Sequence, residues 1–404
     1  MIKKTIHRLL RRRHFWREIG FDELSELYAS MFLRSLSTSL IGIFVPIFLY
    51  KQGISLEGVC LYYVVFFAFR IAIDIIAAFV VGRIGPKHTV VLSTIFTIIN
   101  LMMLMTLKTL HWPLVLVSLT NAIATSLFFI AFHTDFSKVK DALHGGKELG
   151  YLLTMQNIGG VLGPLVGGII ATVYDVRYTI FIAISLLAFS LVPLFTTNEA
   201  VRLHQHITFK GFVWRPHARA FVSYACFGTE NIVCTLIWPL FVSLVVFTSG
   251  TYAKLGAVTA LSTGLTLLFI NFIGRSVDKK QDRLLMRCGV AVNIVLHLLR
   301  TAVTSSLGVI GVNSVNDPIS SMYRMPYIKH YYDFSDSVPG YRIVYIALSE
   351  AASQVGKMLM WLGIAVAMHF VPFTTAVRGA FVVAACISLG ILLQPRKVND
   401  TLEA

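Results

Sequence analysis

The chain has 404 residues, of which 56% are hydrophobic and only 14% charged, and its formal net charge is +15. This composition is too apolar for a soluble domain of that length, so lipid is expected to be the main solvent. The lysines and arginines lie mainly in the N-terminal segment and in alternate loops. That distribution is typical of membrane proteins and excludes nucleic acid as the partner that explains the charge.

Residues 1–27 are basic and contain the apolar residues Ile2, Ile6, Leu9 and Leu10. We expect a cytoplasmic amphipathic helix whose apolar face lies on the membrane while its arginines contact anionic headgroups. The apolar run that follows is longer than the core of a secretory signal, and no small-residue cleavage site comes after it. An organellar transit peptide is the alternative interpretation.

Twelve apolar stretches fill the rest of the chain, and each is long enough to cross a hydrocarbon core of ~30 Å as a helix. They lie at 28–50, 57–81, 88–108, 112–134, 149–173, 178–197, 219–247, 252–274, 285–304, 305–326, 342–369 and 371–393. Because the stretches are continuous and lack the alternation of barrel strands, the predicted class is an all-α membrane protein. An even number of crossings with basic alternate loops places both termini in the cytoplasm, and we expect a bacterial inner membrane.

The longest loop separates two sets of six expected helices. Pro46 and Tyr151 in the first set recur as Pro239 and Tyr345 in the second at a nearly constant offset. Parallel six-helix repeats of this kind occur in transporters, with the substrate site near the bilayer midplane between the halves. The expected division is an N-terminal bundle at 28–197, a cytoplasmic linker at 198–218, a C-terminal bundle at 219–393 and a cytoplasmic tail at 394–404.

In span count, orientation and central loop, the whole chain resembles the major facilitator superfamily. The loop signature of that family is degraded after the second expected helix, where Gly82 occupies the acidic position, and is better kept after the eighth, from Gly274 to Asp278. The resemblance implies the major facilitator fold, with two six-helix bundles related by pseudo-two-fold symmetry. It also implies transport by alternating access, although Gly82 puts in doubt any gating role that needs a carboxylate there.

The fifth span carries a glycine motif similar to the signature on the fifth helix of antiporter members of that family. Glycines four residues apart let another helix approach closely, and a proline inside the helix permits a bend. Ordinary packing through small residues is the alternative interpretation. The motif consists of Gly159, Gly163, Pro164, Gly167 and Gly168.

Eight charged residues, four of each sign, lie within the expected spans. Each would cost ~2.5–3.5 kcal/mol if it faced lipid at the bilayer centre, so we expect these residues to face protein or water. Counting only charges more than five residues from either end of a span, they are Arg34, Arg70, Asp74, Glu230, Asp317, Glu350, Lys357 and Arg378.

Several of these charges are predicted to form a gate or charge network. Arg34, Arg70, Asp74 and Glu350 lie at similar depths on the cytoplasmic side, and Lys357 lies in the same span as Glu350. The family resemblance brings helices 2 and 11 together, so Arg70 or Arg34 could pair with Glu350. Static ion pairs that merely allow the helices to insert are the alternative.

Glu230 and Asp317 lie near mid-depth in spans that line the central cavity in the resembled family. No basic residue in its own span pairs with Glu230, and a carboxyl in such a cavity can take up and release a proton. We therefore predict proton coupling by Glu230, with Asp317 second, against the alternative of a buried structural acid. His133 and His297 are isolated in sequence and are expected to be hydrogen-bonded rather than metal-binding.

The leading hypothesis is a secondary transporter that exports small amphipathic molecules in exchange for protons. Uptake by symport is one alternative, and a non-transporting scramblase, receptor or structural membrane protein is another. The sequence lacks nucleotide-binding and hydrolase motifs, so no enzymatic activity is expected. The expected partners are a small-molecule substrate, a proton or other ion, and membrane lipids, with no cofactor and no metal.

Overall fold

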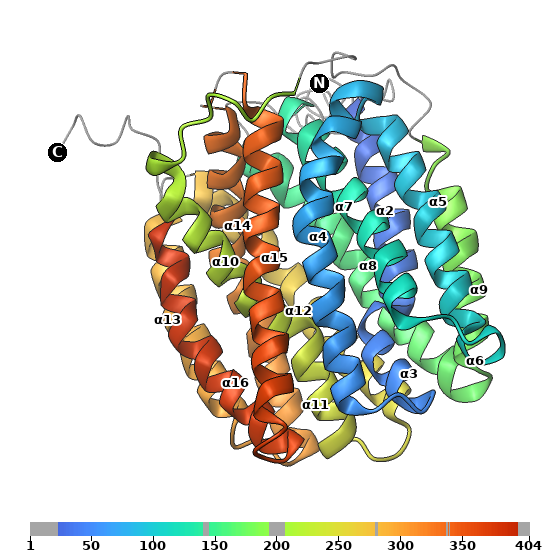
Figure 1. Cartoon of the computed structure of the whole chain (residues 1–404). Coiled ribbons are helices and arrows are strands. Elements are labelled where there is room, and N and C mark those ends of the chain that lie inside the picture. Colours follow the sequence, from blue (N-terminus) through green and yellow to red (C-terminus); the bar gives the residue numbers. More distant parts are fainter. Residues whose placement is uncertain are drawn as a thin grey trace, which may run out of the picture.

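The structure is a computed structural model that describes residues 23–139, 145–193, 207–278, 282–336, 338 and 340–394. Most of the expected amphipathic segment at 1–27 and the expected tail at 394–404 therefore lie outside the described residues. The described part is helical throughout its regular structure, without a strand, which confirms the all-α class (Figure 1).

The first half of the chain forms six passes through the bundle. Its helices are α2 (Glu23–Ile41), η2 (Gly42–Phe44) and α3 (Val45–Lys51), which follow one another as one pass, then α4 (Leu56–Ile84), α5 (Pro86–Met105) with the short α6 (Leu107–Leu110), α7 (Leu114–Val139), α8 (Gly145–Val173) and α9 (Val176–Phe189).

The second half repeats this plan. Its helices are η4 (Arg215–His217), α10 (Ala218–Ile232), η5 (Val233–Ile237) and α11 (Trp238–Val245) as one pass, then α12 (Thr251–Asp278), α13 (Asp282–Arg300), α14 (Ser306–Asp336), α15 (Arg342–Ala367) and α16 (Phe373–Ser388) with η6 (Leu389–Leu393). Each expected span thus corresponds to one helix or one run of helices.

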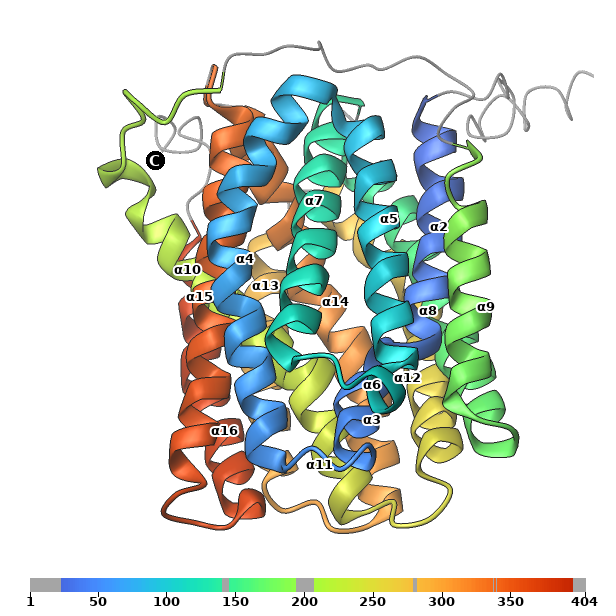
Figure 2. The ribbon, with the colours of Figure 1, turned by 45° about the vertical axis from the view of Figure 1, so that its right-hand side comes forward.

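Local sequence explains where the passes begin and end. The Ser55 hydroxyl accepts a hydrogen bond from the Gly58 amide at 3.0 Å and caps α4. At the other end of α4, Gly85 adopts a positive φ of 84° and Pro86 begins α5 without an amide to satisfy. We call the end of the bundle that carries Gly85 the Gly85 end, and the opposite end, which carries Gly53, the Gly53 end (Figure 2).

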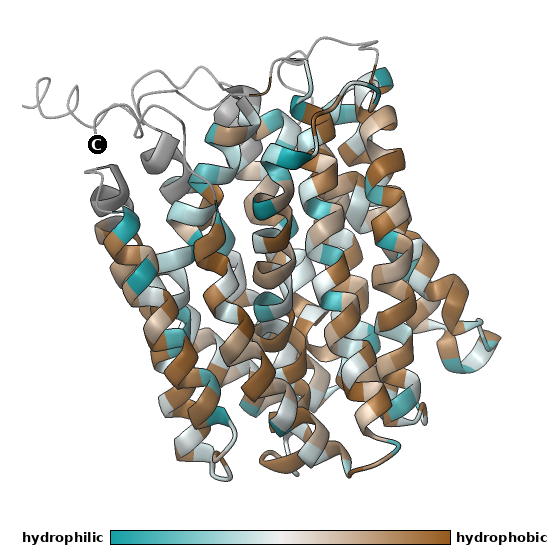
Figure 3. Cartoon of the chain, turned by 60° about the vertical axis from the view of Figure 1, so that its left-hand side comes forward, coloured by the Kyte–Doolittle hydropathy of each residue, from teal (hydrophilic) through white to brown (hydrophobic). Residues whose placement is uncertain are grey.

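The outer surface is apolar along the helices. Figure 3 shows hydrophobic residues along most outward-facing helix surfaces, and large side chains such as Leu268 (74% exposed), Phe181 (64%) and Ile76 (57%) point away from the protein. Eight helices of the described part are long and apolar enough to cross a membrane, and α9 is a shorter apolar helix. Because such a surface is stable only against hydrocarbon, the chain is a multi-pass integral membrane protein.

Two pairs of long helices join the halves: α4 packs beside α15, and α8 packs beside α12 (Figure 1). Polar and aromatic contacts cross between the halves at both ends. At the Gly85 end, His133 Nδ1 of α7 lies 2.6 Å from the Tyr332 hydroxyl of α14. Toward the Gly53 end, the Tyr63 and Trp361 rings stack with their centroids 4.7 Å apart.

The structure corrects two expected boundaries. Helix α14 continues to Asp336, ten residues beyond the expected end of that span at 326. Helix α13 ends at Arg300, four residues before the expected end of that span at 304, and Arg300 is fully buried. A run of apolar residues locates the part of a helix that lies inside hydrocarbon. Such a run does not show where helical turns continue into polar sequence, so the helix ends differ from the expected bounds.

Candidate functional site

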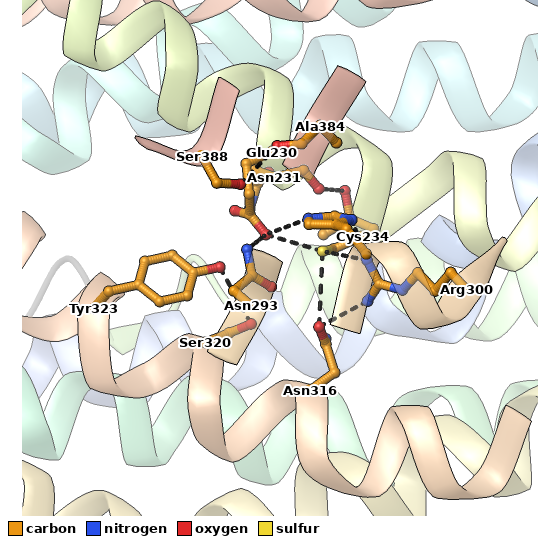
Figure 4. A network of polar contacts seen from close by, with 12 residues as sticks. Glu230, Asn231, Cys234, Asn293, Arg300, Asn316, Ser320, Tyr323, Ala384 and Ser388 are labelled. Atoms are coloured by element: carbon orange, nitrogen blue, oxygen red, sulfur yellow. Dashed lines mark hydrogen bonds and ion pairs between the residues drawn. The ribbon is translucent and has the colours of Figure 1, made fainter. Parts of the chain in front are cut away.

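Glu230 lies in the last turn of α10 and is almost completely buried, with 1% exposure. Its Oε1 atom accepts a hydrogen bond from the Cys234 thiol at 3.0 Å and from the Asn293 amide at 3.3 Å, and it lies 3.7 Å from His297 Nε2 (Figure 4). Cys234 belongs to η5, a π-helical segment, and such segments occur frequently at functional sites.

Arg300 brings a positive charge into the same cluster. Its guanidinium donates to His297 Nδ1 at 2.9 Å, to Cys234 Sγ at 3.2 Å and to Asn316 Oδ1 at 2.7 Å. Because arginine can only donate hydrogen bonds, His297 Nδ1 must be the acceptor. We therefore assign a neutral His297 that carries its proton on Nε2, directed at Glu230.

The network continues to the second predicted carboxylate. Asn316 links Arg300 to Asp317, because its Nδ2 atom donates a hydrogen bond to Asp317 Oδ1 at 2.9 Å. The other Asp317 oxygen accepts from the Thr263 hydroxyl of α12 at 3.3 Å. Arg300 is thus connected to Glu230 and to Asp317 through neutral side chains. We call Glu230, Cys234, Asn293, His297, Arg300, Asn316 and Asp317 the Glu230 network.

No basic residue of its own span contacts Glu230, but a basic residue of another pass, His297, lies 3.7 Å from its carboxylate. The neighbour comes from α13, a different pass of the same half, which inspection of the span of Glu230 could not reveal. A sequence signal did exist, because His297 and Arg300 are three residues apart inside an expected span and so share one helix face. Cys234, Asn293 and Thr263 carried no comparable signal.

Glu230, Cys234 and His297 offer three ligand atoms that lie within 4.8 Å of one another, a spacing that could hold a metal ion. The surrounding hydrogen bonds do not fit such a site. Arg300 donates to His297 Nδ1, so the proton on Nε2 removes the lone pair that a metal would need. Arg300 also places a permanent cation against Cys234 Sγ. The cluster is therefore built as a hydrogen-bonded network.

A cavity of about 260 Å³ lies between the halves and reaches the Glu230 network. Gly160 and Pro164 of α8 contribute to its wall from the first half, and Glu230 and Asp317 contribute from the second. The polar side chains of this wall include Asn157, Asn231, Thr259, Thr263, Asn313, Asn316, Ser320 and Arg324. Both predicted proton-coupling residues therefore line one space between the halves.

A second cavity of about 230 Å³ is lined by residues nearer the Gly85 end. It shares Asn231 and Arg324 with the first cavity, so these two side chains stand at the boundary between both spaces. Its remaining wall consists of Arg70, Phe129, His133, Leu153, Gln156, Tyr224, Phe227, Tyr327, Ile328, Tyr331, Ser349, Glu350, Ser353 and Lys357.

Three of the predicted network residues, Arg70, Glu350 and Lys357, line this second cavity, and a fourth, Asp74, lies beside Arg70. Arg70 Nη2 lies 3.7 Å from Asp74 Oδ1 within α4 and 3.9 Å from Glu350 Oε2 of α15, across the halves. The Gln354 amide lies 3.4 Å from one oxygen of each carboxylate, and Lys357 Nζ donates to Gln354 Oε1 at 3.2 Å. A cross-half charge network is thus present around Gln354, which sequence reasoning had not included.

Arg34 lies elsewhere. Its guanidinium donates to the hydroxyls of Ser93 and Thr94 of α5 at 3.1 Å, and its carbon lies 3.7 Å above the Phe128 ring. Among the described residues it has no ion pair with Glu350, so of the two pairings that the sequence left open only that of Arg70 with Glu350 is present. The sequence gives the position of Arg34 along its helix, but it does not give the direction in which the side chain leaves that helix.

The glycine motif of α8 faces two different helices. A side chain at Gly159, Gly163 or Gly167 would run into α2; at Gly163 an added Cβ would lie 2.6 Å from Ser39 Cβ. On the neighbouring face, a Cβ at Gly168 would lie 2.5 Å from the carbonyl oxygen of Tyr252 in α12. The motif therefore serves close packing both within the first half and across to the second.

The remaining motif positions have simpler placements. Gly256 of α12 faces the Pro164 carbonyl of α8, so the close approach of these two helices depends on small residues from both sides. Gly274 and Asp278 lie in the last two turns of α12.

The sequence from residue 27 to 321 matches the family model described as Major Facilitator Superfamily. The crystal structure of the human organic anion transporter MFSD10 (TETRAN) aligns with a TM-score of 0.71 and 11% identity, over 93% of this chain and 100% of that one. A mutant of the nucleoside transporter NupG aligns with a TM-score of 0.66 and 12% identity, over 92% and 98%. At these identities the likeness shows the fold alone. No curated protein matches the chain.

Proposed function

The chain belongs to the major facilitator superfamily and is a membrane transporter rather than an enzyme, and from this premise we propose that it couples transport to protons through Glu230. The observation that carries the proposal is the position of this buried carboxylate at the wall of the cavity between the halves. Asp317, in the same wall, is the second proton site.

The hydrogen bonds around Glu230 support a change of protonation there. The acceptor oxygen faces a thiol and an amide, and both are neutral donors. Protonation of Glu230 would convert it from an acceptor into a donor and would require these contacts to rearrange. A buried charge in a membrane protein costs free energy unless an opposite charge balances it. Protonation of Glu230 would remove its negative charge and leave the positive charge of Arg300 less well balanced.

The network also offers a route from the proton to the movement of the halves. Asp317 accepts from Thr263, and Thr263 belongs to α12. Helix α12 is packed directly on α8 of the other half through Gly168 and Gly256. A change in the hydrogen bonds of Glu230 can therefore affect the α8–α12 interface, across which the two halves move relative to each other during alternating access.

We propose export of small amphipathic molecules as the direction, in exchange for protons. The glycine motif of α8 supports this direction, because it is similar to that of antiporters. The titles of the two similar structures name different substrate classes, organic anions and nucleosides, so they do not select a substrate. Uptake by symport is the second outcome of the experiment below.

The experiment uses the purified full chain in proteoliposomes with naphthalene-2-sulfonate and 2-naphthyltrimethylammonium as impermeant amphipathic probes. Antiport predicts accumulation of a probe when the lumen is acidic, whereas symport predicts accumulation when the lumen is alkaline. Glu230→Gln should abolish accumulation in response to the pH gradient and retain probe exchange, because glutamine hydrogen-bonds but carries no ionisable proton. Glu57→Gln, at a side chain that is 46% exposed, is the matched control and should behave as wild type. Gradient-driven accumulation by the Glu230→Gln variant would refute the coupling role.

A further inference from the structure

Arg324 occupies a special place, because it lines both cavities and has no ion pair with a described carboxylate. Arg324 lies within α14, six residues after Pro318. Its guanidinium carbon lies 5.9 Å from the centroid of the Phe227 ring. Asn231 also belongs to both walls, so a molecule at the boundary between the two cavities would contact this cation and Asn231.

The second cavity carries more positive than negative charge. Arg70, Arg324 and Lys357 line it, and Glu350 is the one carboxylate among the described residues of its wall. Arg70 is engaged with Asp74 and Glu350, whereas the Lys357 ammonium contacts only the neutral Gln354 oxygen within hydrogen-bond distance. Two cations, Arg324 and Lys357, are therefore without a carboxylate within ion-pair distance in the described part of the chain.

Aromatic rings provide the apolar part of the same cavity. The Phe227 and Tyr327 rings are stacked with their centroids 4.4 Å apart and their planes 8° apart, and Tyr224 lies edge-on to Tyr327 at 5.6 Å. These three rings line the cavity together with Phe129 and Tyr331. These rings offer an apolar surface next to Arg324, which itself faces the Phe227 ring.

The unbalanced cations indicate what this space would accept. A cation inside a membrane protein is stable when an anion or water meets it, and a guanidinium can grip a carboxylate, sulfonate or phosphate with two parallel hydrogen bonds. A cationic substrate would instead meet two unpaired like charges. A neutral one would leave both charges unmatched.

We propose that the second cavity binds an amphipathic organic anion, with the acidic group between Arg324 and Lys357 and the apolar or aromatic part against Phe227 and Tyr327. This inference deepens the proposed function by naming the chemical class of the transported molecule. The size of the cavity, about 230 Å³, lies below the ~300–1,000 Å³ that is typical of small-molecule sites, which suits a compact anion.

The test measures equilibrium binding to the purified full chain in detergent, without a proton gradient. Three probes of similar shape are compared: naphthalene-2-sulfonate, the neutral naphthalene-2-sulfonamide and the cationic 2-naphthyltrimethylammonium. The sulfonate should raise the melting temperature and bind at least tenfold more tightly than the other two. Equal binding of all three probes would overturn the proposal.

Variants then locate the site. Arg324→Gln and Lys357→Gln should each weaken sulfonate binding about tenfold or more, and Arg324→Lys should retain part of it. Arg177→Gln and Lys254→Gln are the matched controls, because both side chains are exposed and lie at the Gly53 end. Sulfonate affinity that survives Arg324→Gln in a protein with an unchanged elution profile would also overturn the proposal.

The outcome is independent of the proton-coupling proposal. Glu230→Gln should bind the sulfonate, because Glu230 does not line the second cavity. If Glu230→Gln still accumulates a probe in response to a pH gradient while Arg324→Gln loses sulfonate binding, the coupling role fails and the anion site stands. If binding shows no preference for the sulfonate while Glu230→Gln loses accumulation, the anion site fails and the coupling role stands.

Discussion

The Tyr332 hydroxyl and His133 Nδ1, 2.6 Å apart, connect α14 of the second half to α7 of the first. The same imidazole places its Nε2 atom 3.6 Å from Glu350 Oε1 of α15. His133 therefore contacts two helices of the opposite half at once. This bridge borders the second cavity on the Gly85 side, where opening would require both contacts to separate.

The first prediction concerns this bridge. Tyr332→Phe removes one cross-half hydrogen bond, which is worth about 0.5–1.5 kcal/mol, so the open fraction at the Gly85 end should rise about two- to tenfold. The measurement is the rate at which an impermeant maleimide labels Leu153→Cys, a position in the wall of the second cavity, above the background of the parent protein. Tyr174→Phe, at an exposed side chain, should leave the rate unchanged. An unaltered rate in Tyr332→Phe would show that the hydroxyl does not hold this end closed.

The second prediction separates the two faces of the glycine motif. Gly167→Ala puts a methyl group against the backbone of α2 inside one half, so it should lower the melting temperature strongly. Gly168→Ala meets α12 across the halves, so it should reduce transport more than stability. Gly264→Ala, which has open space around its added methyl, is the control for both. If both motif variants behaved like Gly264→Ala, the interpretation that these glycines allow close packing of α8 would be wrong.

The third prediction concerns Arg70 and Glu350. In a double-mutant cycle with glutamine at both positions, we expect a coupling of about 0.5–3 kcal/mol in the free energy of unfolding, because each single variant removes one of the opposite charges that balance its partner. The cycle of Arg70→Gln with Glu57→Gln should be additive, since thirteen helical residues place these two about 20 Å apart along α4. Additivity in the first cycle would mean that the 3.9 Å approach contributes nothing.

The fourth prediction addresses Arg300. Arg300→Gln removes the one cation of the Glu230 network and leaves Glu230 and Asp317 without its charge, so it should destabilise the protein by about 3–5 kcal/mol. Adding Glu230→Gln to that variant should restore part of the lost stability, because a neutral amide then replaces one of the two carboxylates. Thermal unfolding in detergent measures both effects, with Arg177→Gln as an exposed control. A double variant less stable than Arg300→Gln would show that charge balance is not what Arg300 supplies.

The sequence by itself determined the class of the protein and the course of its chain. Long apolar runs identify membrane helices because the cost of exposing polar groups to hydrocarbon acts on each segment separately. The same local rules gave the depth of Glu230 and Asp317 and the small-residue face of α8. These features depend on residues close together in the chain, which is why they could be read before any contact was known.

Only the tertiary structure decided which charges meet. Arg34 and Arg70 lie at similar depths, yet Arg34 contacts hydroxyls of α5 whereas Arg70 lies 3.9 Å from Glu350. Glu230 finds its neighbours on α13, more than sixty residues away along the chain. Depth gives the position of a side chain along the helix axis. The rotation of the helix about that axis decides which neighbouring helix the side chain faces. That rotation is set by the packing of all neighbouring helices together, so no single span contains it.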